Sequence, residues 1–153
     1  MADITPMLQA ERDALSAFIT LLETEQQALV SGNTEQLLPL SESKVLAVQE
    51  LGKLASLRRD ELLARTGKEE PGGMTAWLQA NAANVLPIWQ DIQHLAEQAQ
   101  QLNRTNGILI QTKLRHNQQA LVALQGAAQN TSSLYGPDGQ HNLPTSGRIL
   151  GSV

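Results

Sequence analysis

The sequence predicts an all-α fold: an elongated antiparallel helical hairpin followed by one long C-terminal helix, arranged as a coiled-coil-like bundle. Aromatic residues make up only 3% of the 153 residues, so aliphatic side chains on helices must supply most of the core. Apolar residues recur at steps of three and four, which is the period of one helix face. Long stretches also lack glycine and proline, the residues that interrupt helices.

A first amphipathic helix is expected over residues 5–30. Thr5 followed by Pro6 is typical of a helix cap and first turn, because the missing N–H of proline costs nothing there. The apolar stripe of this helix includes two carboxylates, Glu11 and Glu25. Its members are Leu8, Glu11, Leu15, Phe18, Leu22, Glu25 and Leu29.

The chain is expected to reverse direction just after this helix. Gly32 suits the left-handed position that ends a helix, and Asn33 is expected to cap the next one. A second helix, residues 34–65, then runs back antiparallel because the connection is short. Pro39 either kinks this helix or marks its true start. The core candidates of the second helix are Leu37, Leu40, Val48, Leu51, Leu54, Leu57 and Leu62.

A loop over residues 66–73 ends the hairpin, because it contains four Gly or Pro residues. A short helix over residues 74–82 follows, and its Trp77 is expected to close one end of the hairpin. The C-terminal residues 136–153 have turn chemistry without periodicity. We therefore expect residues 1–135 to form a single helical domain and residues 136–153 to form a flexible tail.

The long helix is expected over residues 84–133, with a change of phase in its middle. Its stripe first follows steps of four and three, through Ile88, Ile92, Leu95, Ala99 and Leu102. Beyond Asn103, Asn106 and Gly107 the stripe moves around the helix and continues at Ile110, Leu114, Asn117, Leu121, Leu124 and Ala128. Such a break changes the local supercoil, so the two halves are predicted to face different neighbours. The first half is predicted to pack within the domain.

The second half of this helix is unusual in its charge. No Asp, Glu, Lys or Arg occurs between Asn117 and Pro137, and a helix with so little charge is not typical of a merely solvated face. Core packing alone is the simpler explanation of a leucine stripe. The phase change and the missing charge together favour a surface for another chain.

The overall composition excludes several classes of protein. Residues 1–70 hold 12 acids and 7 bases, whereas residues 71–153 hold 3 acids and 4 bases, with none of the clustered Lys and Arg that nucleic acids require. There are no cysteines, which excludes disulfides and thiolate metal sites. The first residues lack the pattern of a secretory signal, and no apolar run approaches the ~18 residues of a membrane span. We expect a soluble, cytoplasmic protein with no membrane insertion and no nucleic-acid partner.

An enzyme site is not favoured, and no catalytic residue, metal ligand or cofactor is assigned. Asp91 and His94 have the spacing that places two metal ligands on one helix face, but no second acid-x-x-His exists on another helix. His116 and His141 stand without suitable neighbours. Carboxylates on the apolar stripe of the first helix can be catalytic with a raised pKa. They are more often paired, here with the cations of the second helix, Lys44, Lys53 or Arg58.

Three segments together resemble a known family. They are Ser41-Glu-Ser-Lys44 in the second helix, Asn103-Arg-Thr-Asn106-Gly-Ile-Leu-Ile110 in the long helix, and Leu134-Tyr-Gly-Pro-Asp-Gly-Gln140 at its end. In a small acidic helical protein this combination is similar to the FlgN family of flagellar export chaperones, over nearly the whole chain. The Asn-x-x-Asn-Gly element places Asn103, Asn106 and Gly107 in mid-helix. There a glycine costs roughly 1 kcal/mol against alanine and is expected to allow close approach or bending.

The resemblance implies a cytoplasmic chaperone for the hook-filament junction proteins, also called hook-associated proteins, which it keeps soluble and delivers to the type III export gate. An amphipathic terminal helix of such a client would lie along Ile110, Leu114, Leu121 and Leu124. Tyr135 would dock on the cytoplasmic domain of the export gate, or else pack back on the helix end. The alternative is a non-catalytic coiled-coil adaptor or structural protein that self-assembles through the same helix, and a homodimer is left open.

Overall fold

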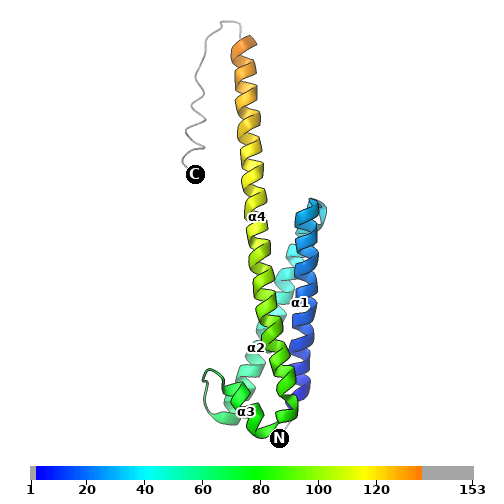
Figure 1. Cartoon of the computed structure of the whole chain (residues 1–153), viewed down its shortest axis with the longest axis vertical. Helices are drawn as coiled ribbons and strands as arrows, with labels where there is room; N and C mark the ends of the chain where they lie inside the picture. Colours follow the sequence, from blue (N-terminus) through cyan, green and yellow to red (C-terminus); the bar gives the residue numbers. More distant parts are fainter. Residues whose placement is uncertain (1–2, 136–153) are drawn as a thin grey trace. The chain divides into compact units, whose positions relative to one another are not determined.

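The computed structural model describes the backbone of residues 3–135 and the side chains of residues 3–126. It is built from helices and contains no strand within that range. Figure 1 shows the four α-helices, which are α1 (Thr5–Ser31), α2 (Leu37–Thr66), α3 (Gly73–Asn81) and α4 (Leu86–Tyr135). Two 3-10 turns, Thr34–Gln36 and Ala83–Val85, precede α2 and α4. The all-α prediction is confirmed, and the expected tail, residues 136–153, lies outside the described part.

The chain divides into two compact units, Met1–Leu109 and Ile110–Val153. The first unit contains α1, α2, α3 and the first part of α4. The described part of the second unit is the remainder of α4. The boundary falls just after Asn106 and Gly107, where the sequence predicts the change of phase.

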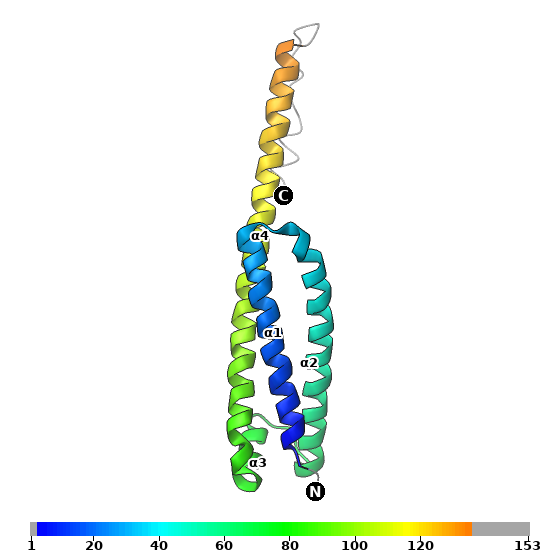
Figure 2. The same cartoon turned by 90° about the vertical axis from the view of Figure 1, so that its right-hand side faces the viewer.

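Within the first unit, α1 and α2 form the predicted antiparallel hairpin (Figure 2). Gly32 ends α1 with φ 73° and donates its N–H to Ala28 O. Pro39 stands in the first turn of α2, which begins at Leu37, so the proline marks the start of the helix rather than a kink. The expected cap by Asn33 is wrong, because its side chain makes no capping hydrogen bond to the turn that follows.

The start of α1 is fixed by an aspartate that the sequence reading overlooked. Asp3 accepts hydrogen bonds from the backbone N–H of Thr5 at 3.0 Å and from its hydroxyl at 2.6 Å. The side-chain bond from Thr5, followed by the backbone bond, lowers the pKa of the Asp3 carboxyl. The expected cap role of Thr5 is therefore wrong: Thr5 is the first residue of the helix, with Pro6 in the first turn, and Ile4 is the N-cap without a side-chain capping bond.

The first part of α4 runs beside α1 in the same direction, as both views show. Arg12 lies 3.7 Å from Asp91 near the beginning of the two helices, and Asn106 bonds to Leu22 further along. Ile92 and Ala99 of α4 are buried, whereas Leu95 and Leu102 are partly buried and pack against the core clusters. The first half of the long helix thus packs on the hairpin.

Two clusters of apolar side chains form the core of the first unit. The larger contains Ile4, Leu8, Leu15, Leu62, Met74, Leu78, Val85, Trp89 and Ile92. The smaller contains Phe18, Ile19, Leu22 and Ala99. The buried members of α1 follow the stripe that the sequence predicts, so α1 is the central helix of this unit.

Trp89, not Trp77, is the buried tryptophan at the end of the hairpin opposite the α1–α2 connection. Its indole N–H donates to Thr75 Oγ1 at 3.1 Å, and the guanidinium carbon of Arg58 lies 4.8 Å from the ring centroid. Trp77 is only half-buried, with Arg65 4.9 Å from its ring centroid. The expected closing role of Trp77 therefore falls mainly to Trp89, whose polar N–H finds a partner inside.

The predicted core of α2 is partly wrong. Val48 and Leu57 are more than half exposed, Leu51 and Leu54 are half-buried, and Leu62 is buried. The reason is that apolar residues occur all around α2, so a periodicity reading cannot select the inner face. The large apolar residues that α2 leaves exposed are Leu38, Val45, Leu46, Val48, Leu57 and Leu63.

Truncating a core leucine of α1 tests this assignment. Leu22 is 0% exposed, so Leu22→Ala is expected to lower the free energy of unfolding by about 2 to 5 kcal/mol. Leu46→Ala on α2 is the matched control, because Leu46 is 66% exposed and its truncation is expected to cost no more than about 0.5 kcal/mol. Urea unfolding followed by circular dichroism measures both, and equal losses would contradict the assignment.

Candidate functional site

The two carboxylates on the buried stripe of α1 are paired with cations of α2. Glu11 accepts from Arg58 Nε through both oxygens, at 3.1 and 2.8 Å. Glu25 Oε1 accepts from Lys44 Nζ at 3.2 Å. Lys53 takes no part in either pair. This arrangement supports the structural reading of the two glutamates, because each carboxylate is occupied by a partner across the hairpin.

The two pairs also fix the register of the hairpin. Glu11 and Glu25 lie fourteen residues apart on α1, and Arg58 and Lys44 lie fourteen residues apart on α2. A slip of either helix would leave two buried carboxylates without their cations, which is strongly unfavourable. The charges therefore specify one alignment of two helices.

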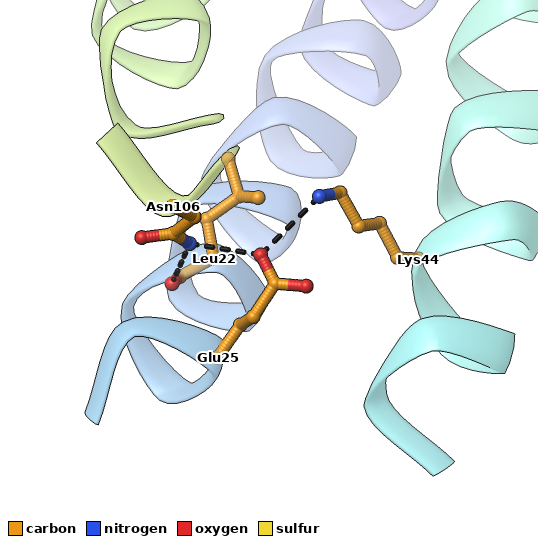
Figure 3. A network of polar contacts seen from close by, with 4 residues as sticks. All are labelled: Leu22, Glu25, Lys44 and Asn106. Carbon is orange, nitrogen blue, oxygen red and sulfur yellow. Dashed lines mark hydrogen bonds and ion pairs between the residues drawn. The ribbon is translucent and has the colours of Figure 1, made fainter. Parts of the chain in front are cut away.

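Asn106 connects α4 to the same network (Figure 3). Its Nδ2 donates to the backbone oxygen of Leu22 at 2.8 Å and to Glu25 Oε1 at 2.9 Å. One carboxylate oxygen thus accepts from both Asn106 and Lys44, which joins three helices at one point. Asn106 is 0% exposed, and its Oδ1 has no hydrogen-bond partner within the part of the chain that the structure describes.

The three residues of the Asn-x-x-Asn-Gly element have different surroundings. Asn103 is exposed, Asn106 is fully buried and Gly107 is half-buried. Of the two roles expected of Gly107, close approach is wrong, because no described atom beyond its own stretch of helix lies within 4 Å of the place a Cβ would occupy, and bending stays a prediction. The element therefore contributes chiefly one buried amide.

The second unit presents an exposed apolar helix face, which we call the α4 face and define by Ile110, Leu114, Leu121 and Leu124. Steps of four, seven and three place these residues on one side of the helix. Their exposed fractions are 37%, 58%, 58% and 68%. A row of exposed apolar side chains along one side of a helix marks a candidate binding face.

Tyr135 is the last residue of α4, and its side chain lies outside the described side chains. Its two predicted roles, docking and packing, therefore stay predictions.

Neither a metal site nor a membrane span emerges from residues 3–126. Asp91, the acid of the Asp91-x-x-His94 spacing, lies 3.7 Å from Arg12 Nη1. No group of three or more His, Asp or Glu that could hold a metal ion occurs among the residues searched. No helix in the described range is long and apolar enough to cross a bilayer. His141 lies outside that range.

The fold and the candidate face define a class: an all-α protein whose long terminal helix presents apolar side chains to solvent. Comparison with known proteins identifies the particular family. The family model described as FlgN protein matches residues 1–142. The chain therefore belongs to the FlgN family.

Curated relatives agree with this assignment. The chain is 31% identical over 142 residues to the flagella synthesis protein FlgN of Escherichia coli K12, covering 92% of this chain and 91% of that protein. It is 32% identical to the protein of the same name from Yersinia enterocolitica, covering 86% and 84% of the two chains. The Salmonella typhimurium protein is 28% identical, covering 94% and 93%. No solved structure matches the chain significantly.

Replacing Asn106 by aspartate tests the buried polar network. Asn106→Asp sets a second carboxylate against Glu25, and we expect a loss of about 3 kcal/mol or more in unfolding free energy at pH 7.5. Repulsion and burial raise the pKa of one carboxyl in the folded state, so the loss shrinks as the pH falls toward about 5.

Asn103→Asp makes the same chemical change on an exposed residue of the same helix and serves as the control. It is expected to stay within about 0.5 kcal/mol of the unchanged protein at both pH values. Denaturant titrations at the two pH values measure the free energy of unfolding of both variants. If Asn106→Asp behaved like Asn103→Asp, the amide would not be part of a buried network.

Proposed function

We propose that this chain is an export chaperone of the bacterial flagellum. It binds hook-filament junction proteins in the cytoplasm, prevents their premature assembly and delivers them to the type III export gate, without catalysis. Membership of the FlgN family and relatives named flagella synthesis proteins support the flagellar assignment. The α4 face supports the binding role.

The observation that carries the proposal is the exposure of the α4 face. A client that assembles through an amphipathic terminal helix must keep the apolar side of that helix covered until export. Leu114, Leu121 and Leu124 offer such a helix a complementary apolar side, in the way that helices dock on grooves of other partners. Burying one leucine side chain contributes about 1.5 to 3 kcal/mol, so a few such contacts give useful affinity without permanent association.

The buried network gives this face a support. Asn106 and the ion pairs attach the first part of α4 to the hairpin, only a few residues before Ile110 begins the α4 face. We propose that residues 1–135 act as one chaperone domain in which the hairpin holds α4 and α4 holds the client. The client is then recognised by side chains on the surface of α4 and not by an enclosed pocket.

Tyr135 is proposed as the contact with the export gate. An aromatic side chain with a hydroxyl can bury its ring in a partner and still satisfy its polar atom. Its position at the end of α4 separates it in sequence from the α4 face, so one helix can bear client and gate at different segments.

The rival proposal is a self-assembling coiled-coil adaptor. Sedimentation of the full chain, with and without the terminal segment of a hook-junction protein, separates the two. A stable one-to-one complex supports the chaperone. Concentration-dependent self-assembly with no client binding supports the adaptor.

Charged substitutions on the α4 face are expected to weaken client binding without unfolding the protein. Leu121→Asp or Leu124→Asp would bury an unpaired carboxylate in the complex and weaken binding by about 3 kcal/mol, more than a hundredfold in Kd. Isothermal titration with the client's terminal segment measures the Kd, and circular dichroism measures the helix content.

The matched control is Leu46→Asp on α2, because Leu46 is 66% exposed and Leu124 is 68% exposed. It introduces the same charge on an equally exposed leucine and is expected to leave the Kd unchanged. If Leu124→Asp unfolded the protein, or if both variants lost binding equally, the α4 face would not be the client surface.

Tyr135→Ala is expected to reduce export while leaving client affinity unchanged. Loss of a buried aromatic anchor costs about 2 kcal/mol or more at its own interface, which here is the gate. Tyr135→Phe keeps the ring and is expected to retain most export. Secretion of the junction protein into the medium and its Kd in solution are measured in parallel, and equal loss of both in Tyr135→Ala would indicate a packing role.

A further inference from the structure

The second part of α4 carries basic residues but no acidic ones. Its last acid is Glu97, and the next acid in the chain is Asp138. Within residues 110–126, the described side chains of the second unit, the charged residues are Lys113 and Arg115. The α4 face therefore lies on a helix segment with positive charge and no acid.

Neither cation is neutralised by the described part of the chain. Lys113 and Arg115 take part in no ion pair there, unlike Lys44, Arg58 and Arg12 of the first unit. Lys113 directly precedes Leu114 and follows Ile110 by three residues, so it stands at the edge of the α4 face. Arg115, two residues later, lies on the other side of the helix, beyond Gln111 and Gln118, and its charge acts there only over the screening length of about 8 Å at physiological salt.

The opposite edge of the α4 face is neutral and can donate hydrogen bonds. Gln111, Gln118 and Gln125 recur every seven residues and are exposed, so they form a column beside the leucines. A side-chain amide can donate to a carboxylate, and so can an ammonium group. Both edges of the α4 face can therefore bind an anionic partner, and neither carries an acid that would repel one.

We infer that the occupant of the α4 face is an amphipathic helix whose apolar stripe is flanked by aspartate or glutamate where it lies against Lys113. This inference rests on the proposed function and adds the chemistry of the client segment. A helix flanked by Lys or Arg would bring like charges together, which lowers both affinity and association rate. A second copy of the same segment would do the same, so the charges also oppose self-assembly through this face.

Two synthetic helical peptides test the inference directly. Both carry the same leucine heptads, one with glutamate and one with lysine at the flanking positions, and each is titrated against the full chain by fluorescence anisotropy at 50 and 300 mM NaCl. The glutamate peptide is expected to bind about tenfold more tightly at the lower salt, with the preference shrinking at the higher salt. The double variant Lys113→Glu with Arg115→Glu is expected to reverse the preference.

The control variant is Lys53→Glu with Arg59→Glu on α2 of the first unit, which changes the net charge equally without altering the second unit. It is expected to retain the preference for the glutamate peptide. The terminal segment of a hook-junction protein is titrated alongside, under the same salt conditions and with both double variants.

The outcomes separate this inference from the proposed function. Tight binding of the junction segment that ignores salt and charge reversal would overturn the inference and leave the chaperone intact. Failure of the junction segment to bind at all would overturn the proposed function. A free chain that dimerises, with the dimer lost in Leu121→Asp, would assign the face to a second copy and overturn both.

Discussion

One carboxylate oxygen ties the first unit together. Glu25 Oε1 accepts from Lys44 of α2 and from Asn106 of α4, and Asn106 also bonds to the backbone of α1. Because Glu25 and Asn106 are buried, any alignment that breaks these bonds leaves a buried polar atom unpaired. Apolar packing alone would allow the three long helices to pack in several neighbouring registers. This network and the second ion pair, between Glu11 and Arg58, are compatible with one register only.

A fixed register has a consequence for α4. The helix packs on the hairpin as far as Asn106. Four residues later, Ile110 begins a segment whose leucines are exposed. The same helix therefore serves two purposes, with burial in its first part and a solvent-facing apolar side in its second. The absence of acids between Glu97 and Asp138 is the basis of the electrostatic preference proposed for the exposed side.

The sequence predicted the helices well because their periodicity and their breakers agree. Gly32 at φ 73° and the apolar stripe of α1 both behave as their residue types require. The same logic failed for Val48 and Leu57, since α2 has apolar residues on every side and its inner face depends on where α1 and α4 pack. The closing role expected of Trp77 falls to Trp89 for a similar reason, because the partner of an indole N–H, here Thr75, is set by tertiary contacts.

The candidate site, like the fold, could be predicted from the sequence only in part. That the carboxylates on α1 pair with cations of α2 was one of the readings that the sequence allowed, yet choosing Lys44 and Arg58 over Lys53 required the register of the hairpin. The burial of Asn106 beside exposed Asn103 could not be read from the motif, because both are asparagines on one helix. The central claim is that residues 110–126 of α4 hold the client. Amide hydrogen exchange of the full chain, with and without the terminal segment of a hook-junction protein, tests it most directly. The account predicts that added protection is concentrated in residues 110–126 and absent from residues 38–48 of α2; protection confined to α2, or no change along α4, would contradict it.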